Sequence, residues 1–294
     1  MEKKTSTLEL KSYAKINLFL EVLQRLENNY HGISTFFSEI ELYDNIKFSL
    51  TKNQEINMLC TNKSLVSSEN LIYKIAIYIQ AIYSVQCGAL LELEKNIPIA
   101  AGLGGGSSNA ATTIKGLSEL WDLNLSKREM HDIGSKFGSD INFFLEGYQA
   151  IGSNRGELIE PILDEINLDN ILLVNPNFFI SSGEAYEMLY TDDTFSLPSH
   201  TKNKISFLKQ LLEKQNPKFC FNRLERGICL RYPILQETLN KLNEYGAQKA
   251  MLSGSGPTMI GIFADPISLK KAQKSMEEMH FWSFKTTTRR RPKK

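Results

Sequence analysis

The order of strand-like and helix-like segments predicts an α+β protein whose strands pair mostly in the antiparallel sense. Three observations support this prediction. Several short stretches alternate apolar and polar residues, which is typical of half-buried strands. Longer stretches space their apolar residues as a helix does, and some begin with capping residues. The chain closes on a strand, a helix and a strand, and it contains no internal repeat or low-complexity linker.

In chain order, the elements expected in the N-terminal half are strands at 16–23, 39–43, 45–50 and 89–94 and helices at 71–84, 107–121 and 126–137. Asp44 is expected to separate the second and third strands. Ser68 is the candidate cap of the first helix. Ser126 and Glu129 have the spacing of a capping box at the start of the third. An apolar stretch follows the break at Gly138.

In the C-terminal half, the expected elements are strands at 171–174, 259–263 and 281–287 and helices at 182–190, 205–214, 231–244 and 267–279. The basic tail at 289–294 is expected to be a solvated, frayed terminus.

Composition indicates a globular, cytoplasmic enzyme rather than a disordered chain. Apolar residues make up 42% of the sequence, charged residues 23%, and the net charge is +1. A dedicated nucleic-acid binder is normally strongly basic, so we expect no nucleic-acid partner. The four cysteines and four histidines are dispersed, which argues against a zinc site or a disulfide framework. The opening residues have no signal-peptide pattern, and the apolar run at 71–85 is too short to span a bilayer.

A glycine-rich segment between two predicted elements is the strongest functional signal. It begins at Pro98, contains Gly102 and Gly104–Gly106, and leads through Ser107 and Ser108 into a predicted helix. Glycines allow backbone N–H groups to close around an anion, and a helix N-terminus adds unpaired N–H groups and a favourable dipole. The pattern is neither a P-loop nor a dinucleotide loop. It predicts a phosphate site, with a flexible turn as the alternative.

This segment resembles the phosphate loop of the GHMP kinases, the superfamily of galactokinase and of homoserine, mevalonate and phosphomevalonate kinases. Two further motifs of that superfamily have counterparts here, at Ala14–Leu18 and at Leu252–Thr258. The resemblance implies a two-domain fold. An N-terminal mixed sheet with helices would occupy 1–160, and a C-terminal ferredoxin-like α/β sandwich 161–294. It also implies ATP and Mg²⁺ as cofactors, with Ser108 as a tentative ligand of the metal.

The residues that the resemblance implies for ATP binding are Asn70, Lys95, Pro98, Ile99, Ala100, Ala101, Gly102, Leu103, Gly104, Gly105, Gly106, Ser107 and Ser108. Because Gly105 lies in this segment, Gly105→Val is expected to abolish ATP binding while leaving the fold largely intact.

Asp140 and Lys15 are the candidate catalytic residues. Asp140 lies two residues after Gly138 and precedes an apolar run, and in the resembling kinases the matching aspartate is the base. Lys15 lies at the start of a predicted strand, where it would hold that carboxylate ionised and balance charge as the proton moves. The alternatives are an ordinary turn aspartate and a lysine that reaches the surface from an edge strand.

A Tyr30-His31 pair resembles a signature of one branch of this superfamily, whose members act on a cytidine diphosphate-linked polyol. In that branch the segment holds the cytidine. Tyr30 would then stack on cytosine, His31 would contact its polar edge, and Tyr186 would close the other face. The full set implied for the substrate is Asn17, Tyr30, His31, Phe37, Ser182 and Tyr186. Tyr30 and Phe37 as core aromatics, and His31 as an ordinary loop histidine, are the alternatives.

The sequence as a whole therefore predicts a kinase that phosphorylates the 2-hydroxyl of such a polyol in isoprenoid precursor synthesis, without nucleic-acid or membrane partners. Two other functions remain open. A homoserine or mevalonate type of kinase would not need the Tyr-His pair. A catalytically silent relative would have no reason to keep Lys15, Asp140 and an intact glycine segment.

Overall fold

The computed structural model describes residues 6–26, 31–189, 198–214 and 216–292. These residues form two compact units, and each unit is assembled from several chain segments. The first unit takes the described part of 1–14 together with 42–98 and 105–147, and the second takes 15–41, 99–104 and the rest from 148. Strands β1 (Thr7–Arg25) and β2 (His31–Thr51) are long enough to contribute residues to both.

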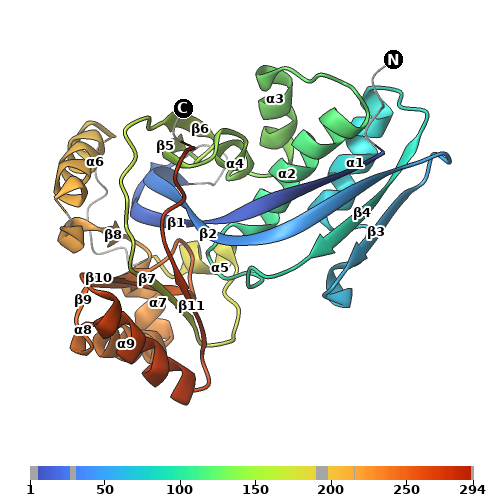
Figure 1. The fold of residues 1–294 in the computed structure, drawn as a ribbon. Helices are drawn as coiled ribbons and strands as arrows, with labels where there is room; N and C mark the ends of the chain where they lie inside the picture. The colour runs from blue at the N-terminus through green and yellow to red at the C-terminus, as the bar shows by residue number, and fades with distance from the viewer. Residues whose placement is uncertain (1–5, 27–30, 190–197, 215, 293–294) are drawn as a thin grey trace. The chain divides into compact units, whose positions relative to one another are not determined.

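The first unit combines a mixed sheet with helices (Figure 1). The second half of β2 pairs antiparallel with β4 (Gly88–Glu94), and β4 pairs parallel with β3 (Ile56–Cys60). The helical elements of this unit are η1 (Lys63–Leu65), α1 (Leu71–Ile82), α2 (Gly105–Leu120), α3 (Lys127–Phe137) and α4 (Ile141–Glu146). Helix α2 packs against the other three α-helices. It lies close to the sheet because Gly116 has no side chain: a Cβ there would be 2.5 Å from Cζ of Phe48.

The second unit contains a four-stranded antiparallel sheet with the order β11-β7-β10-β9. Its strands are β7 (Ile171–Asn175), β9 (Ala247–Leu252), β10 (Met259–Phe263) and β11 (Trp282–Thr286). Helices α8 (Pro233–Glu244) and α9 (Pro266–Glu278) pack against this sheet (Figure 1). All five residues of β7 are buried, as the apolar run at 171–174 predicts.

The remaining elements of the second unit surround the first half of β2 and the middle of β1. They are β5 (Gln149–Asn154), β6 (Leu158–Pro161), α5 (Ser182–Glu187), α6 (Pro198–Glu213), η2 (Pro217–Phe219), β8 (Phe221–Asn222) and α7 (Glu225–Arg231). β5 pairs antiparallel with β2 and with β6, and β8 pairs parallel with β1. Among the described residues, no helix has the length and apolar character needed to cross a membrane.

The predicted fold class is confirmed, but several predicted boundaries are wrong. Asp44 does not separate two strands, because it lies within the continuous strand β2. Helix α1 is capped by Asn70 rather than by Ser68. The helix predicted at 231–244 begins at Pro233 instead, and the short helix α7, which ends at Arg231, was not predicted. The capping box of α3, by contrast, is present as predicted.

The prediction of a frayed basic tail is also wrong for its described part. Arg289 forms a 2.7 Å ion pair with Glu39 and lies 4.3 Å from the centroid of the Tyr148 ring. Arg290 is paired with Asp169, and the backbone N–H of Arg291 donates to a glutamate side chain. These arginines therefore hold the chain end against the second unit.

Candidate functional site

The glycine segment has the backbone of a tight, strained turn. Ala100, Gly102 and Gly104 have φ values of 48°, 73° and 68°, so left-handed residues recur at alternate positions. Turns that include left-handed residues are one way in which proteins gather N–H groups around an anion. Helix α2 starts within the segment, at Gly105, so its first N–H groups lack partners within the helix.

The three sequence motifs meet within the second unit. The backbone N–H of Lys15 donates to the carbonyl of Leu103 at 3.0 Å, and the Ser253 hydroxyl donates to the carbonyl of Gly102 at 3.1 Å. A Cβ at Gly102 would lie 2.0 Å from the carbonyl oxygen of Ser253. Gly102 is therefore required for close contact between two motifs, a role that its place in a phosphate loop does not reveal.

Lys15 is buried and participates in an ordered polar chain. Its Nζ donates to Oδ1 of Asn17 at 2.6 Å, and Asn17 in turn donates through Nδ2 to Thr35 at 2.8 Å. A Cβ at Gly254, whose φ is 55°, would lie 3.2 Å from Nζ of Lys15. The lysine is only 5% exposed, so the alternative of a lysine that reaches the surface does not apply. The contacts around Lys15 are those of a residue held in one orientation.

Asp140 lies in the first unit, immediately before α4. Its backbone is helical and its carboxylate does not cap that helix. The side chain is partly buried. Asp140 also lies in a turn, so the alternative of an ordinary turn aspartate stays open. Its pairing with Lys15 stays a prediction.

The two glycines that open α2 are not equivalent. Gly105 is buried, and a Cβ there would lie 3.0 Å from Ile97 and 3.2 Å from Nζ of Lys95. Gly106 is exposed, and a Cβ there would meet nothing within 4 Å. The structure therefore does not support the expectation that Gly105→Val spares the fold. Ser107 is partly buried, whereas Ser108 is 1% exposed and its hydroxyl lies 2.7 Å from that of Ser12.

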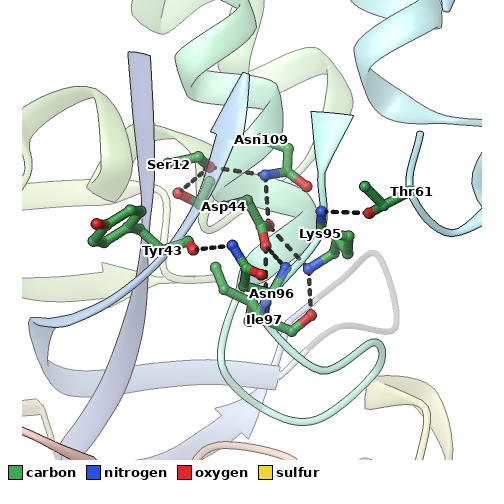
Figure 2. A network of polar contacts seen from close by, with 9 residues as sticks. Ser12, Tyr43, Asp44, Thr61, Lys95, Asn96, Ile97 and Asn109 are labelled. Carbon is green, nitrogen blue, oxygen red and sulfur yellow. Dashed lines mark hydrogen bonds and ion pairs between the residues drawn. The ribbon is translucent and has the colours of Figure 1, made fainter. Parts of the chain in front are cut away.

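Lys95 and Asn70 both have local partners in the first unit. Lys95 forms a buried 2.9 Å ion pair with Asp44 (Figure 2). Burial lowers the pKa of Lys95, and the carboxylate of Asp44 partly opposes this shift. Asn70 caps α1 through Oδ1 and donates through Nδ2 to the carbonyl of Leu65. Sequence reasoning missed Asp44, although an acid in the middle of an apolar alternation was a visible signal.

The structure describes only some of the residues that are predicted to bind the cytidine, because Tyr30 lies outside the described residues. His31 and Tyr186 stack on each other in the second unit, with ring centroids 5.7 Å apart and planes within 10°. Burial and the charge of Arg25 lower the pKa of His31, which favours the neutral imidazole. Ser182 is the exposed first residue of α5, and Phe37 is a core aromatic, 1% exposed.

Among the described residues, no group of three or more acidic, histidine or cysteine side chains is arranged to hold a metal ion. Ser108, the tentative ligand, has its hydroxyl in the contact with Ser12.

Comparison with known proteins defines the class of protein to which this chain belongs. The models of the N-terminal and C-terminal domains of GHMP kinases match residues 70–148 and 207–280. A homoserine kinase from Cytophaga hutchinsonii has the same fold, with a TM-score of 0.72 at 11% identity over 98% of this chain and 96% of its own. The fold and the matched domains are those of the GHMP kinases.

Two relatives show to which family within this class the chain belongs. The 4-diphosphocytidyl-2-C-methyl-D-erythritol kinase of Thermoanaerobacter pseudethanolicus is 36% identical over 96% of both chains. That of Caldanaerobacter subterraneus is 38% identical over 93% of this chain and 94% of its own. A solved structure of a kinase of this name has a TM-score of 0.82 at 25% identity and covers 96% of this chain and 100% of its own. The chain belongs to the 4-diphosphocytidyl-2-C-methyl-D-erythritol kinase family.

Proposed function

We propose that this protein transfers the γ-phosphoryl group of ATP to the 2-hydroxyl of 4-diphosphocytidyl-2-C-methyl-D-erythritol, a step of isoprenoid precursor synthesis. The proposal rests above all on one observation: relatives of that name match the chain over nearly its whole length. The convergence of the three motifs in the second unit agrees with it, because phosphoryl transfer depends mostly on accurate positioning.

In the proposed reaction, Asp140 accepts the proton of the attacking hydroxyl as the phosphorus–oxygen bond forms. Lys15 balances the negative charge that develops, and its contact with Asn17 keeps the ammonium group in place. The N–H groups at the start of α2 hold the phosphates. Mg²⁺ would neutralise phosphate charge when it is bound. A direct bond from Ser108 to the metal would require the contact with Ser12 to open, and no step here depends on it.

For the acceptor, we propose that the cytosine is held by Tyr186 and Tyr30 and that His31 contacts its polar edge. The stack of His31 on Tyr186 supports this proposal, because it brings two of the three proposed residues side by side. A neutral His31 has one donor and one acceptor nitrogen, which suits the edge of cytosine. Asn17 and Ser182 are proposed to contact the polyol or the diphosphate.

A competition assay tests the function directly. The protein, with ATP and Mg²⁺, is offered the diphosphocytidyl polyol, homoserine, mevalonate and galactose together, and the phosphorylated products are identified by mass. We expect the polyol to be the substrate used. Preferential phosphorylation of homoserine or mevalonate would refute the proposed acceptor but not the kinase class. ATP binding without any product would favour a silent relative.

A further inference from the structure

A buried carboxylate in the first unit accepts hydrogen bonds from the segment that leads into the glycine turn. Asp44 is fully buried in β2. Its Oδ1 accepts from the backbone N–H groups of Asn96 at 2.6 Å and Ile97 at 2.8 Å (Figure 2). Pro98 follows directly, so these bonds fix the chain at the point where the glycine segment begins.

The other oxygen of Asp44 reaches the elements beside the segment. Oδ2 accepts from Nζ of Lys95 at 2.9 Å and from Nδ2 of Asn109 at 2.8 Å. Asn109 lies in α2, the helix that follows the segment. The carboxylate therefore accepts four hydrogen bonds, and the one from Lys95 is also an ion pair, which is the kind of compensation that a buried charge requires.

Two hydroxyl groups extend this cluster along α2. Nδ2 of Asn109 also donates to the Ser12 hydroxyl at 2.9 Å, and that hydroxyl lies 2.7 Å from the hydroxyl of Ser108 (Figure 2). Ser12 is on β1. The first two turns of α2 are thus bonded to two strands of the sheet.

Lys95 is held by the same cluster and not directed to solvent. Its side chain is 8% exposed, and its ammonium group donates both to Asp44 and to the carbonyl of Ile97. The Nζ atom lies against the first residue of α2, since a Cβ at Gly105 would be 3.2 Å away. The positive charge of Lys95 is therefore largely balanced by partners within the protein.

We propose that Asp44 is a positioning residue for the phosphoryl donor, and that Lys95 acts with it on the nucleotide through the glycine segment rather than by direct contact. Asp44 bonds the chain on both sides of that segment, through Ile97 before it and Asn109 after it. It thereby sets the direction of the N–H groups at the start of α2. This inference rests on the proposed function, in which those N–H groups bind the phosphates.

Asp44→Asn provides the test. The amide oxygen still accepts from the two backbone N–H groups, but its NH₂ group then faces the donors of Lys95 and Asn109. We expect the dissociation constant for MgATP, measured by calorimetry, to rise about tenfold, as the loss of one charged hydrogen bond implies. The KM for ATP should rise in parallel, while the KM for the acceptor stays unchanged.

Glu39→Gln is the matched control. Glu39 is also buried and accepts from a backbone N–H, that of Tyr148 at 2.6 Å, and from Arg289 at 2.7 Å. This variant should melt at a lower temperature but bind MgATP as the unchanged protein does. If Asp44→Asn bound MgATP normally, or if both variants lost affinity equally, the positioning role would be refuted.

Two further variants cover the case in which Asp44→Asn does not fold. Ser12→Ala removes the link to Asn109 and Ser108 without changing charge, and should raise the MgATP dissociation constant about threefold. The double variant Asp44→Asn, Asn109→Asp exchanges amide and carboxylate and should recover part of the affinity. Unchanged binding in Ser12→Ala, together with no recovery in the exchange, would overturn the proposal. Because these readouts need no acceptor, a failure of the polyol assay would refute the proposed function alone.

Discussion

Replacing Gly106 by valine separates phosphate binding from folding. The residue is exposed and a Cβ there meets nothing within 4 Å, so the protein accommodates the new side chain without clashes. Valine has a somewhat better helix propensity than glycine, and we expect the unfolding free energy to change by less than about 0.5 kcal/mol. The added methyl groups would instead occupy the approach to the first N–H groups of α2. Loss of one charged hydrogen bond weakens binding by about 1.5–3 kcal/mol, so ATP affinity should fall at least tenfold.

Calorimetric titration with MgATP and urea unfolding measure the two effects on the same samples. Gly183→Val is the matched control, because Gly183 also lies in the first turn of a helix with open space around it. It should leave ATP affinity unchanged. Gly105→Val should lose both binding and about 1–3 kcal/mol of stability, since its side chain enters the contacts with Ile97 and Lys95. A folded Gly106→Val protein with normal ATP affinity would show that the start of α2 does not bind phosphate.

The other predictions concern the proposed catalytic and cytidine-binding residues. Asp140→Asn and Lys15→Ala should each lower kcat about 10²-fold or more with little change in ATP binding. The control variant Asp132→Asn, at an exposed position, should leave kcat unchanged. Near-normal turnover of Asp140→Asn at saturating substrates would show that Asp140 is not the base. Tyr186→Ala should raise the KM for the polyol about tenfold and leave that for ATP unchanged, and Tyr186→Phe should be mild because the ring face survives. His31→Ala should relax discrimination between cytidine and uridine diphosphate substrates, which a comparison of kcat/KM for the two would detect. Because the pKa of His31 is lowered from 6.5, the imidazole stays neutral at pH 7, and polyol affinity should fall only as the pH drops below 6.5. An affinity that already falls above pH 6.5 would contradict this role.

Local patterns predicted most of the regular elements because they depend on near neighbours. The capping box at Ser126 and the buried run of β7 are of this kind. The sequence could not show that β2 continues through Asp44, because an acid in a strand is unfavourable until distant residues supply its hydrogen bonds. β5 was also missed, since it pairs with the distant strand β2, and β6 was missed with it because it pairs with β5.

In the candidate site, too, local sequence patterns were predicted correctly, whereas features that depend on distant residues were missed. The motifs around Lys15 and Gly102 were visible, but their roles were not separable from sequence. A Cβ at Gly102 would collide with the carbonyl of Ser253, whereas a Cβ at Gly106 would meet open space. In the sequence, both are simply glycines of one segment. The pairing of Lys95 with Asp44 was likewise hidden, because the two residues are distant in sequence, although an acid within an apolar alternation marked Asp44 as unusual.

The way in which the two units share the chain has a consequence for protein engineering. Each unit takes its residues from several separate stretches, and the boundary at 104/105 falls inside the glycine segment. No single cut would yield a fragment that contains one complete unit, because β1 and β2 each contribute residues to both units. Truncation libraries and split reporters should therefore perform poorly. Insertions in the turn after β5, next to the exposed Asn154, leave both sets of segments intact.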